Sequence, residues 1–202
     1  MPPPRLPAPV EQGRGGERLP LPPPEHMDAA QRAAAQVLID GPRQAVSGPF
    51  VPLIRTPALL ERVAQLGEAL RFGGQLPAAV RELATVVAAQ HVGNQFEWVM
   101  HVPLALAAGI PATALEAIRL GQTPQGLPEA AHAAHAFCTM LLARHGVDDA
   151  CYQRGCAAFG EAGVVELSTL VGYFVMVSWL MNVARTPSRP TAEVQPLPAG
   201  AG

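Results

Sequence analysis

Apolar residues recur along most of the chain at the spacing of an α-helix. Between residues 77 and 93, for example, Val80, Leu83 and Val87 follow one another at intervals of three and four positions, which places them on one face of a helix. No segment shows the alternation of apolar and polar residues that marks a half-buried strand. The pattern predicts an all-α fold.

Capping residues, prolines and glycines divide this pattern into about eight helices. Asp28, Thr56 and Asp148 are good N-caps, and Pro57, Pro77 and Pro128 stand where a first turn tolerates proline. Glycine follows several of the apolar runs and favours their termination. The predicted helices are 28–40, 56–74, 77–93, 94–108, 111–120, 128–144, 148–163 and 164–184.

Proline-rich segments flank the helical part. Residues 1–27 and 186–202 are rich in proline, with few residues able to build a core, a composition that favours extended or disordered chain. We therefore predict a flexible arm over 1–27, a single helical domain over 28–185 and a proline-rich tail over 186–202.

The charge balance excludes several classes of function. Fourteen basic and sixteen acidic residues give a net charge of −2, whereas a protein that binds nucleic acid by neutralising phosphates is usually basic. Every basic residue is arginine, so no lysine can form a Schiff base or serve a P-loop. We expect a small-molecule substrate and no nucleic-acid partner.

Three cysteines, Cys138, Cys151 and Cys156, form no CxxC pair, which is untypical of a disulfide scaffold and indicates a reducing, cytoplasmic location. The proline-rich N-terminus lacks the apolar run of a signal peptide. The longest apolar stretch, 164–184, is interrupted by Glu166 and several hydroxyl or amide residues. It fits a buried helix better than a membrane span, which needs about 20 predominantly apolar residues.

Glu97 and His101 are the strongest candidates for chemistry. They are four residues apart in the predicted helix 94–108, so their side chains lie on one face. A carboxylate there can accept the proton of one ring nitrogen and leave the other nitrogen free to exchange a proton. Pro103, two residues later, should bend the helix beside the histidine. An ordinary exposed ion pair has the same spacing.

Two neighbouring residues in the preceding helix are further candidates. Glu82 stands in a segment otherwise made of leucine, valine and alanine, so it lies either in a solvated first turn or in a site. Arg81 could bind a substrate carboxylate, although adjacent residues of a helix point about 100° apart.

A metal site is a weaker possibility. His132, His135 and Cys138 recur every three residues, but the third position has rotated away from the first by about 240°. Histidine and cysteine packed against neighbouring helices are the more common case, and we expect no metal ion.

The segment that contains Glu82, Glu97 and His101 resembles a known family. The stretch Arg81–Ile110, which includes E-L-A-T-V-V and E-W-V-M-H, resembles the core motif of the carboxymuconolactone decarboxylase family, within the wider alkyl hydroperoxidase-like superfamily. Further similar segments, including Leu70–Gly73 and Gly163–Leu167, extend the resemblance to about residues 18–185. It implies an orthogonal bundle of helices that assembles as a homo-oligomer, commonly a trimer or hexamer, with the site near subunit contacts.

The same resemblance separates two branches of the superfamily. In the peroxidase branch a glutamate, a C-x-x-C pair and a histidine form a thiol site. The corresponding positions here are Glu82, then Asn94 and Glu97 in place of the cysteines, then His101. Because neither Asn94 nor Glu97 can form a thiolate, thiol-dependent peroxide chemistry is disfavoured.

The decarboxylase branch suits the remaining residues. The resemblance implies a cofactor-independent decarboxylase or isomerase that acts on a small lactone-type acid through a dienolate, with His101 as proton donor or acceptor and Glu97 and Glu82 in support. We take Arg81, Trp98 and Asn94 as candidate substrate-binding residues, although scarce aromatic residues belong more often to the core. A non-catalytic helical oligomer that binds a small molecule is the alternative.

Overall fold

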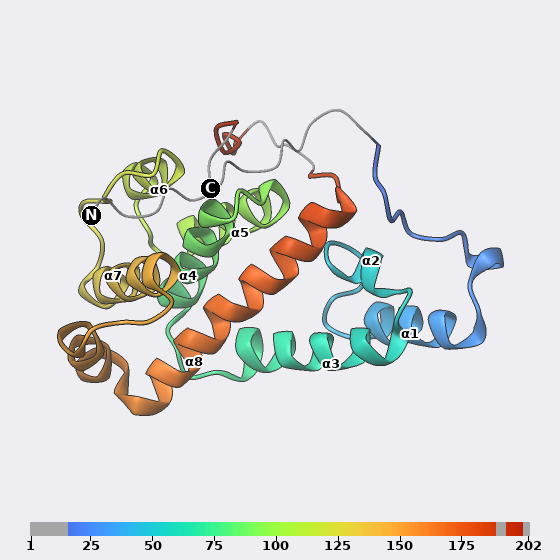
Figure 1. Ribbon diagram of the computed structural model, residues 1–202, viewed down its shortest axis with the longest axis horizontal. Helices are drawn as coiled ribbons and strands as arrows, with labels where there is room; N and C mark the ends of the chain where they lie inside the picture. Colours follow the sequence, from blue (N-terminus) through green and yellow to red (C-terminus); the bar gives the residue numbers. More distant parts are fainter. Residues whose placement is uncertain (1–15, 189–192, 200–202) are drawn as a thin grey trace.

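A computed structural model describes residues 16–188 and 193–199. In this part of the chain all regular structure is helical (Figure 1), as the sequence predicted. The elements are the 3₁₀ turn Pro24–His26, α1 (Ala29–Asp40), α2 (Phe50–Leu53), α3 (Pro57–Glu68), the π-helix Ala69–Gly73, α4 (Ala78–His91), α5 (Gln95–Ala107), α6 (Ala112–Arg119), α7 (Glu129–Arg144) and α8 (Asp149–Ala184).

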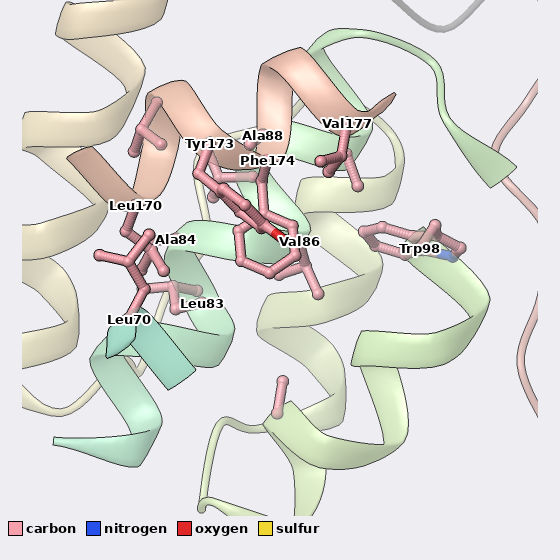
Figure 2. Packing of buried hydrophobic residues seen from close by; sticks show 14 of the residues in the cluster. Leu70, Leu83, Ala84, Val86, Ala88, Trp98, Leu170, Tyr173, Phe174 and Val177 are labelled. Carbon is pink, nitrogen blue, oxygen red and sulfur yellow. The ribbon is translucent and has the colours of Figure 1, made fainter. Parts of the chain in front are cut away.

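Helix α4 lies at the centre of the bundle. It packs against α5, α7 and α8, and Val80, Leu83 and Val86 are completely buried. Alanines at 84, 88 and 89 are buried beside them and let the neighbouring helices approach closely, because they add little volume. Figure 2 shows Leu170, Tyr173 and Phe174 of α8 in the same cluster as Leu83 and Ala84 of α4.

Side-chain caps fix the starts of three helices. The side chains of Asp28, Asn94 and Asp148 each accept a hydrogen bond from the backbone N–H three residues later. Asp28 also forms a reciprocal capping box with Gln31. Each cap satisfies a backbone donor that has no partner within the helix. The caps expected at Asp28 and Asp148 are confirmed, whereas the side chain of Thr56, also expected to cap a helix, makes no capping hydrogen bond at the start of α3.

The structure differs from the predicted elements at three places. The two helices predicted over 148–163 and 164–184 form α8, interrupted by Gly160 with φ 69° and ψ 172°, a backbone conformation that suits glycine. The end of the predicted helix 56–74 is the π-helix Ala69–Gly73. The short helix α2 was not predicted. Pro103 lies inside α5, as the predicted range 94–108 places it.

The two proline-rich segments are held against the domain where the structure describes them. At the N-terminal side, Arg55 donates to the carbonyl oxygens of Leu19 and Pro20. At the C-terminal side, the side-chain amide of Gln95 pairs with the backbone N–H and carbonyl of Leu197, and the Trp98 indole donates to the Gln195 carbonyl. The predicted tail is therefore docked over 193–199, because proline-rich backbone leaves carbonyl oxygens free for side-chain donors. Residues 1–15, the first part of the predicted arm, lie outside the described residues.

Helix α8 crosses the bundle diagonally in Figure 1. Within the described part of the chain it alone is long and apolar enough to cross a membrane by length and composition, and half of its most apolar 18-residue window is buried inside the fold. Its inner side contributes Leu167, Leu170 and Phe174 to the core, and Trp179 and Val183 are exposed on the other side. A core helix of this kind passes the same test of length and hydropathy.

Candidate active site

Three residues of the predicted site come together around the ring of His101. Nδ1 of His101 lies 2.7 Å from Oε2 of Glu82 on α4, and Nε2 lies 3.2 Å from Oε2 of Glu97, one turn earlier on α5. The side chains of all three are more than nine-tenths buried. The imidazole is thus held between two carboxylates, and the second ring nitrogen, expected from the sequence to be free, is bonded to Glu82.

This arrangement raises the pKa of His101. Burial alone would lower the pKa, but the hydrogen bonds with Glu82 and Glu97 and the charges of both carboxylates outweigh it. The direction follows from electrostatics, since two acceptors stabilise an imidazolium that donates from both nitrogens. The ring is therefore suited to hold a proton at neutral pH.

A cavity of roughly 90 Å³ adjoins this group. His101, Glu97 and Phe174 form part of its wall, whereas Glu82 lies behind the histidine and is not among the lining residues. Met100 and Leu104 are exposed and lie at its rim. A proton held by the His101–Glu97 pair can therefore reach a small molecule in the cavity, while Glu82 fixes the ring from the protein interior.

Another part of the cavity wall is basic. Arg43, from the segment between α1 and α2, and Arg71, from the π-helix, both line it, together with the hydroxyl-bearing Tyr173 of α8. The guanidinium of Arg43 lies 4.3 Å from the centre of the Phe50 ring. Arg43 and the Tyr173 hydroxyl lie close enough to interact electrostatically.

Two glycines allow this wall to form. A Cβ at Gly67 of α3 would overlap the Tyr173 hydroxyl, so only glycine lets that hydroxyl approach Arg43 in this position. Gly48 has φ 57° and would place a Cβ 2.8 Å from the ring of Phe96. Both positions therefore favour glycine for steric reasons, the second also for its backbone conformation.

The three candidate substrate-binding residues lie elsewhere. Asn94 is buried, caps α5 and donates to Asn182 Oδ1 at 2.7 Å, which ties the start of α5 to α8. Arg81 donates to the backbone carbonyl of Leu76. Trp98 lines a separate cavity beside residues 193–195. None of the three lines the cavity at His101.

Sequence reasoning gave Arg43 and Arg71 no role. Arg43 follows a Gly-Pro pair that predicts only a helix end, and Arg71 stands in a segment noted for its resemblance alone. The available signal was an arginine within an otherwise apolar segment, which is weak because most arginines are exposed. The contact with Tyr173, 130 residues after Arg43, arises only in the folded chain.

The cysteines and the histidines of α7 do not join the site. Cys138 is buried, and burial, together with the neighbouring Cys151, raises its pKa to about 12, which disfavours a reactive thiolate. Residues 16–188 and 193–199 contain no group of three or more histidine, cysteine or acidic side chains that could hold a metal ion.

Known proteins resemble this chain both in sequence, over part of its length, and in fold. Residues 57–137 match the model of the carboxymuconolactone decarboxylase family, a span that contains α3 to most of α7 and all three residues of the His101 group. No curated protein matches the chain in sequence.

Solved structures with low sequence identity share the fold. A peroxidase-related protein from Ralstonia eutropha JMP134, described as an alkylhydroperoxidase AhpD core, is 17% identical with a TM-score of 0.70, and the match covers 90% of this chain and 95% of that one. A peroxidase-related protein from Silicibacter sp. TM1040 is 14% identical with a TM-score of 0.67, and 96% of each chain is covered.

The debrominase Bmp8, solved in complex with 2,3,4-tribromopyrrole, is 12% identical with a TM-score of 0.65, over 87% of this chain and 93% of that one. At such identities the likeness extends to the fold alone, while the family match covers the core motif that carries Glu82, Glu97 and His101. Residues 57–137 of the chain therefore match the carboxymuconolactone decarboxylase family, and the fold is the one seen in AhpD-like proteins.

Proposed function

We propose that this protein is a cofactor-independent enzyme that decarboxylates or isomerises a small lactone-type carboxylic acid through a dienolate. One observation carries the proposal: the imidazole of His101 is buried between the carboxylates of Glu82 and Glu97 at the wall of a cavity. Buried acid and base groups with a perturbed pKa beside a cavity are typical of sites that transfer protons.

The proposed reaction needs an acid and a way to stabilise negative charge. In a decarboxylation the bond between the ring carbon and the departing carboxylate breaks, CO₂ leaves, and the electron pair moves through the conjugated double bond into the lactone carbonyl. The resulting dienolate then takes a proton at carbon. The His101–Glu97 pair supplies that proton and regains one from water, so the enzyme returns to its starting state.

The position of Glu82 assigns it a different role in this proposal. Because Glu82 bonds the ring nitrogen that faces the interior, the proton leaves on the side of Glu97. Glu82 is then a positioning residue that orients the ring and stabilises the imidazolium.

The cysteines argue against thiol chemistry at this site. The described residues that line the cavity include no cysteine, and Cys138 and Cys151 are buried elsewhere. The fold itself does not choose a reaction, since proteins that share it include a debrominase and peroxidase-related proteins. The proposal therefore rests on the residues of this chain.

The direct test is to incubate the purified protein with γ-carboxymuconolactone and to follow both substrate loss and CO₂ release. We expect substrate loss and CO₂ release to proceed at equal rates. Loss of substrate without CO₂ would favour isomerisation. No change in the substrate with folded protein would overturn the decarboxylase assignment and would favour a related substrate or the non-catalytic binding protein.

The pH dependence tests the role of His101. A general acid must be protonated, and the pKa of His101 is raised above its ordinary value of 6.5. We expect kcat/KM to stay high through pH 6.5 and to fall as the pH rises through the raised pKa. The Glu82→Gln substitution removes one of the two carboxylates that raise this pKa, so its alkaline limb should move to lower pH. Identical limbs in both pH profiles would contradict the assignment.

A further inference from the structure

The basic wall of the cavity contains more hydrogen-bonding capacity than the described protein groups use. The side chain of Arg43 is only 10% exposed, and its Nε is buried without a hydrogen-bond partner. The nearest acid, Glu68, has its Oε1 3.7 Å from that Nε. Among the described residues no hydrogen bond or ion pair to Arg71 is found, and its guanidinium lies 5.2 Å from the centre of the Phe72 ring.

An arginine that is buried without full pairing is costly unless an anion completes its environment. A guanidinium presents five donors in a planar fork, which fits the two oxygens of a carboxylate. Of the Arg43 donors, Nη2 bonds the Ala64 carbonyl at 3.2 Å, and the guanidinium interacts electrostatically with Tyr173. The side chain of Glu68 is 40% exposed, so it can withdraw into solvent when another anion enters.

Tyr173 keeps its proton in this environment. Burial raises the pKa of Tyr173, and the carboxylate of Glu97 adds to the increase, while Arg43 and Arg71 oppose it. The hydroxyl is therefore neutral at physiological pH and can donate a hydrogen bond to an anion beside the two arginines.

A series of contacts connects the basic wall with the His101 group. Tyr173 packs edge-on against Phe174, with ring centroids 5.3 Å apart, and Phe174 packs edge-on against His101 at 5.1 Å. Figure 2 shows Tyr173 and Phe174 side by side on α8. One small molecule in the cavity can thus touch both regions.

We propose that Arg43 and Arg71, with the Tyr173 hydroxyl, form an anion subsite that holds a carboxylate of the substrate which does not itself react. This inference rests on the proposed function, which makes the cavity the substrate site. It adds which residues hold the substrate carboxylate that remains after the reaction. A cation pair on the departing carboxylate would stabilise the ground state more than the transition state, because that charge is lost as CO₂ leaves. The arginines therefore suit a second carboxylate.

Binding measurements test the subsite without any turnover. The probe is 2-furoate, a planar ring with one carboxylate, and methyl 2-furoate is its neutral counterpart. Dissociation constants can be obtained from ligand-observed NMR titrations of the full chain. We expect 2-furoate to bind at least about tenfold more tightly than the ester, because a hydrogen bond to a charged group is worth more than one to a neutral group.

Substitutions identify the residues responsible. Arg43→Gln and Arg71→Gln should each weaken 2-furoate binding by about tenfold or more and leave ester binding unchanged. Arg62→Gln, an exposed arginine of α3 outside the cavity, is the matched control and should bind as the parent does. Thermal unfolding of each variant establishes that it is folded. Should the buried Arg43 variant fail to fold, the half-buried Arg71 decides the question.

The subsite is overturned if the parent does not bind 2-furoate, if the ester binds equally well, or if the arginine variants bind like the parent. These binding results are independent of whether the protein catalyses the proposed reaction. Arginine-dependent binding without turnover of γ-carboxymuconolactone would leave the subsite standing and remove the reaction. Turnover of γ-carboxymuconolactone, together with 2-furoate binding that does not depend on the arginines, would remove the subsite and leave the proposed reaction standing.

Discussion

His101→Ala is expected to lower kcat/KM for the lactone substrate by about a hundredfold or more, since general acid catalysis typically contributes that much. The imidazole contacts both carboxylates of the site, so its removal takes away the group that carries the proton. Steady-state kinetics of parent and variant with γ-carboxymuconolactone give the ratio directly.

The matched control for this substitution is His132→Ala. His132 is exposed on α7 and lies away from the cavity, so its loss should leave kcat/KM unchanged. A His101→Ala variant that is folded and retains parental activity would remove His101 from the mechanism. Circular dichroism and the oligomeric state of both variants should be compared with those of the parent, because the His101 side chain is itself buried.

Leu83→Ala is expected to lower the free energy of unfolding by about 2–5 kcal/mol. Leu83 is completely buried on α4, the helix that α5, α7 and α8 surround. Truncation removes apolar contacts and leaves a cavity that three packed helices cannot readily close. Equilibrium unfolding in urea, with the midpoint and slope fitted together, measures the change.

Leu59→Ala provides the comparison within the same experiment. Leu59 lies on α3 and is 53% exposed, so its truncation should change the free energy of unfolding by about 0.5 kcal/mol or less. A loss at Leu83 no larger than the loss at Leu59 would contradict the central position of α4 in the core.

The helices were readable from the sequence because their signals are local. The side-chain cap at Asp28 and the prolines at the starts of α3, α4 and α7 act within one turn of the backbone they satisfy. The break in α8 was also expected, although it falls at Gly160 rather than after residue 163. In contrast, the docked segment 193–199 was not readable, because its hydrogen bonds with Gln95, Trp98 and Arg119 join residues far apart in the sequence.

The site divides in the same way. The contact between Glu97 and His101 follows from helical spacing, and Glu82 was a candidate as an acidic residue in an otherwise apolar helix, a role that the resemblance reinforced. Neither argument indicated that Glu82 would bond to Nδ1 of His101. The distance between these two atoms depends on how α4 packs against α5. The expected roles of Arg81, Asn94 and Trp98 in substrate binding also depended on packing, and the structure places their side chains away from the cavity.

The sequence by itself determined the all-α class, most helix ends and the resemblance to the family, because capping, periodicity and a contiguous motif are encoded over short distances. Only the tertiary structure decided which side chains share the cavity. Arg43 precedes the segment matched by the family model and Tyr173 follows it. They meet because α8 packs against α4 and the glycine at position 67 of α3 admits the Tyr173 hydroxyl. Such contacts depend on the packing of whole helices, which no local pattern specifies.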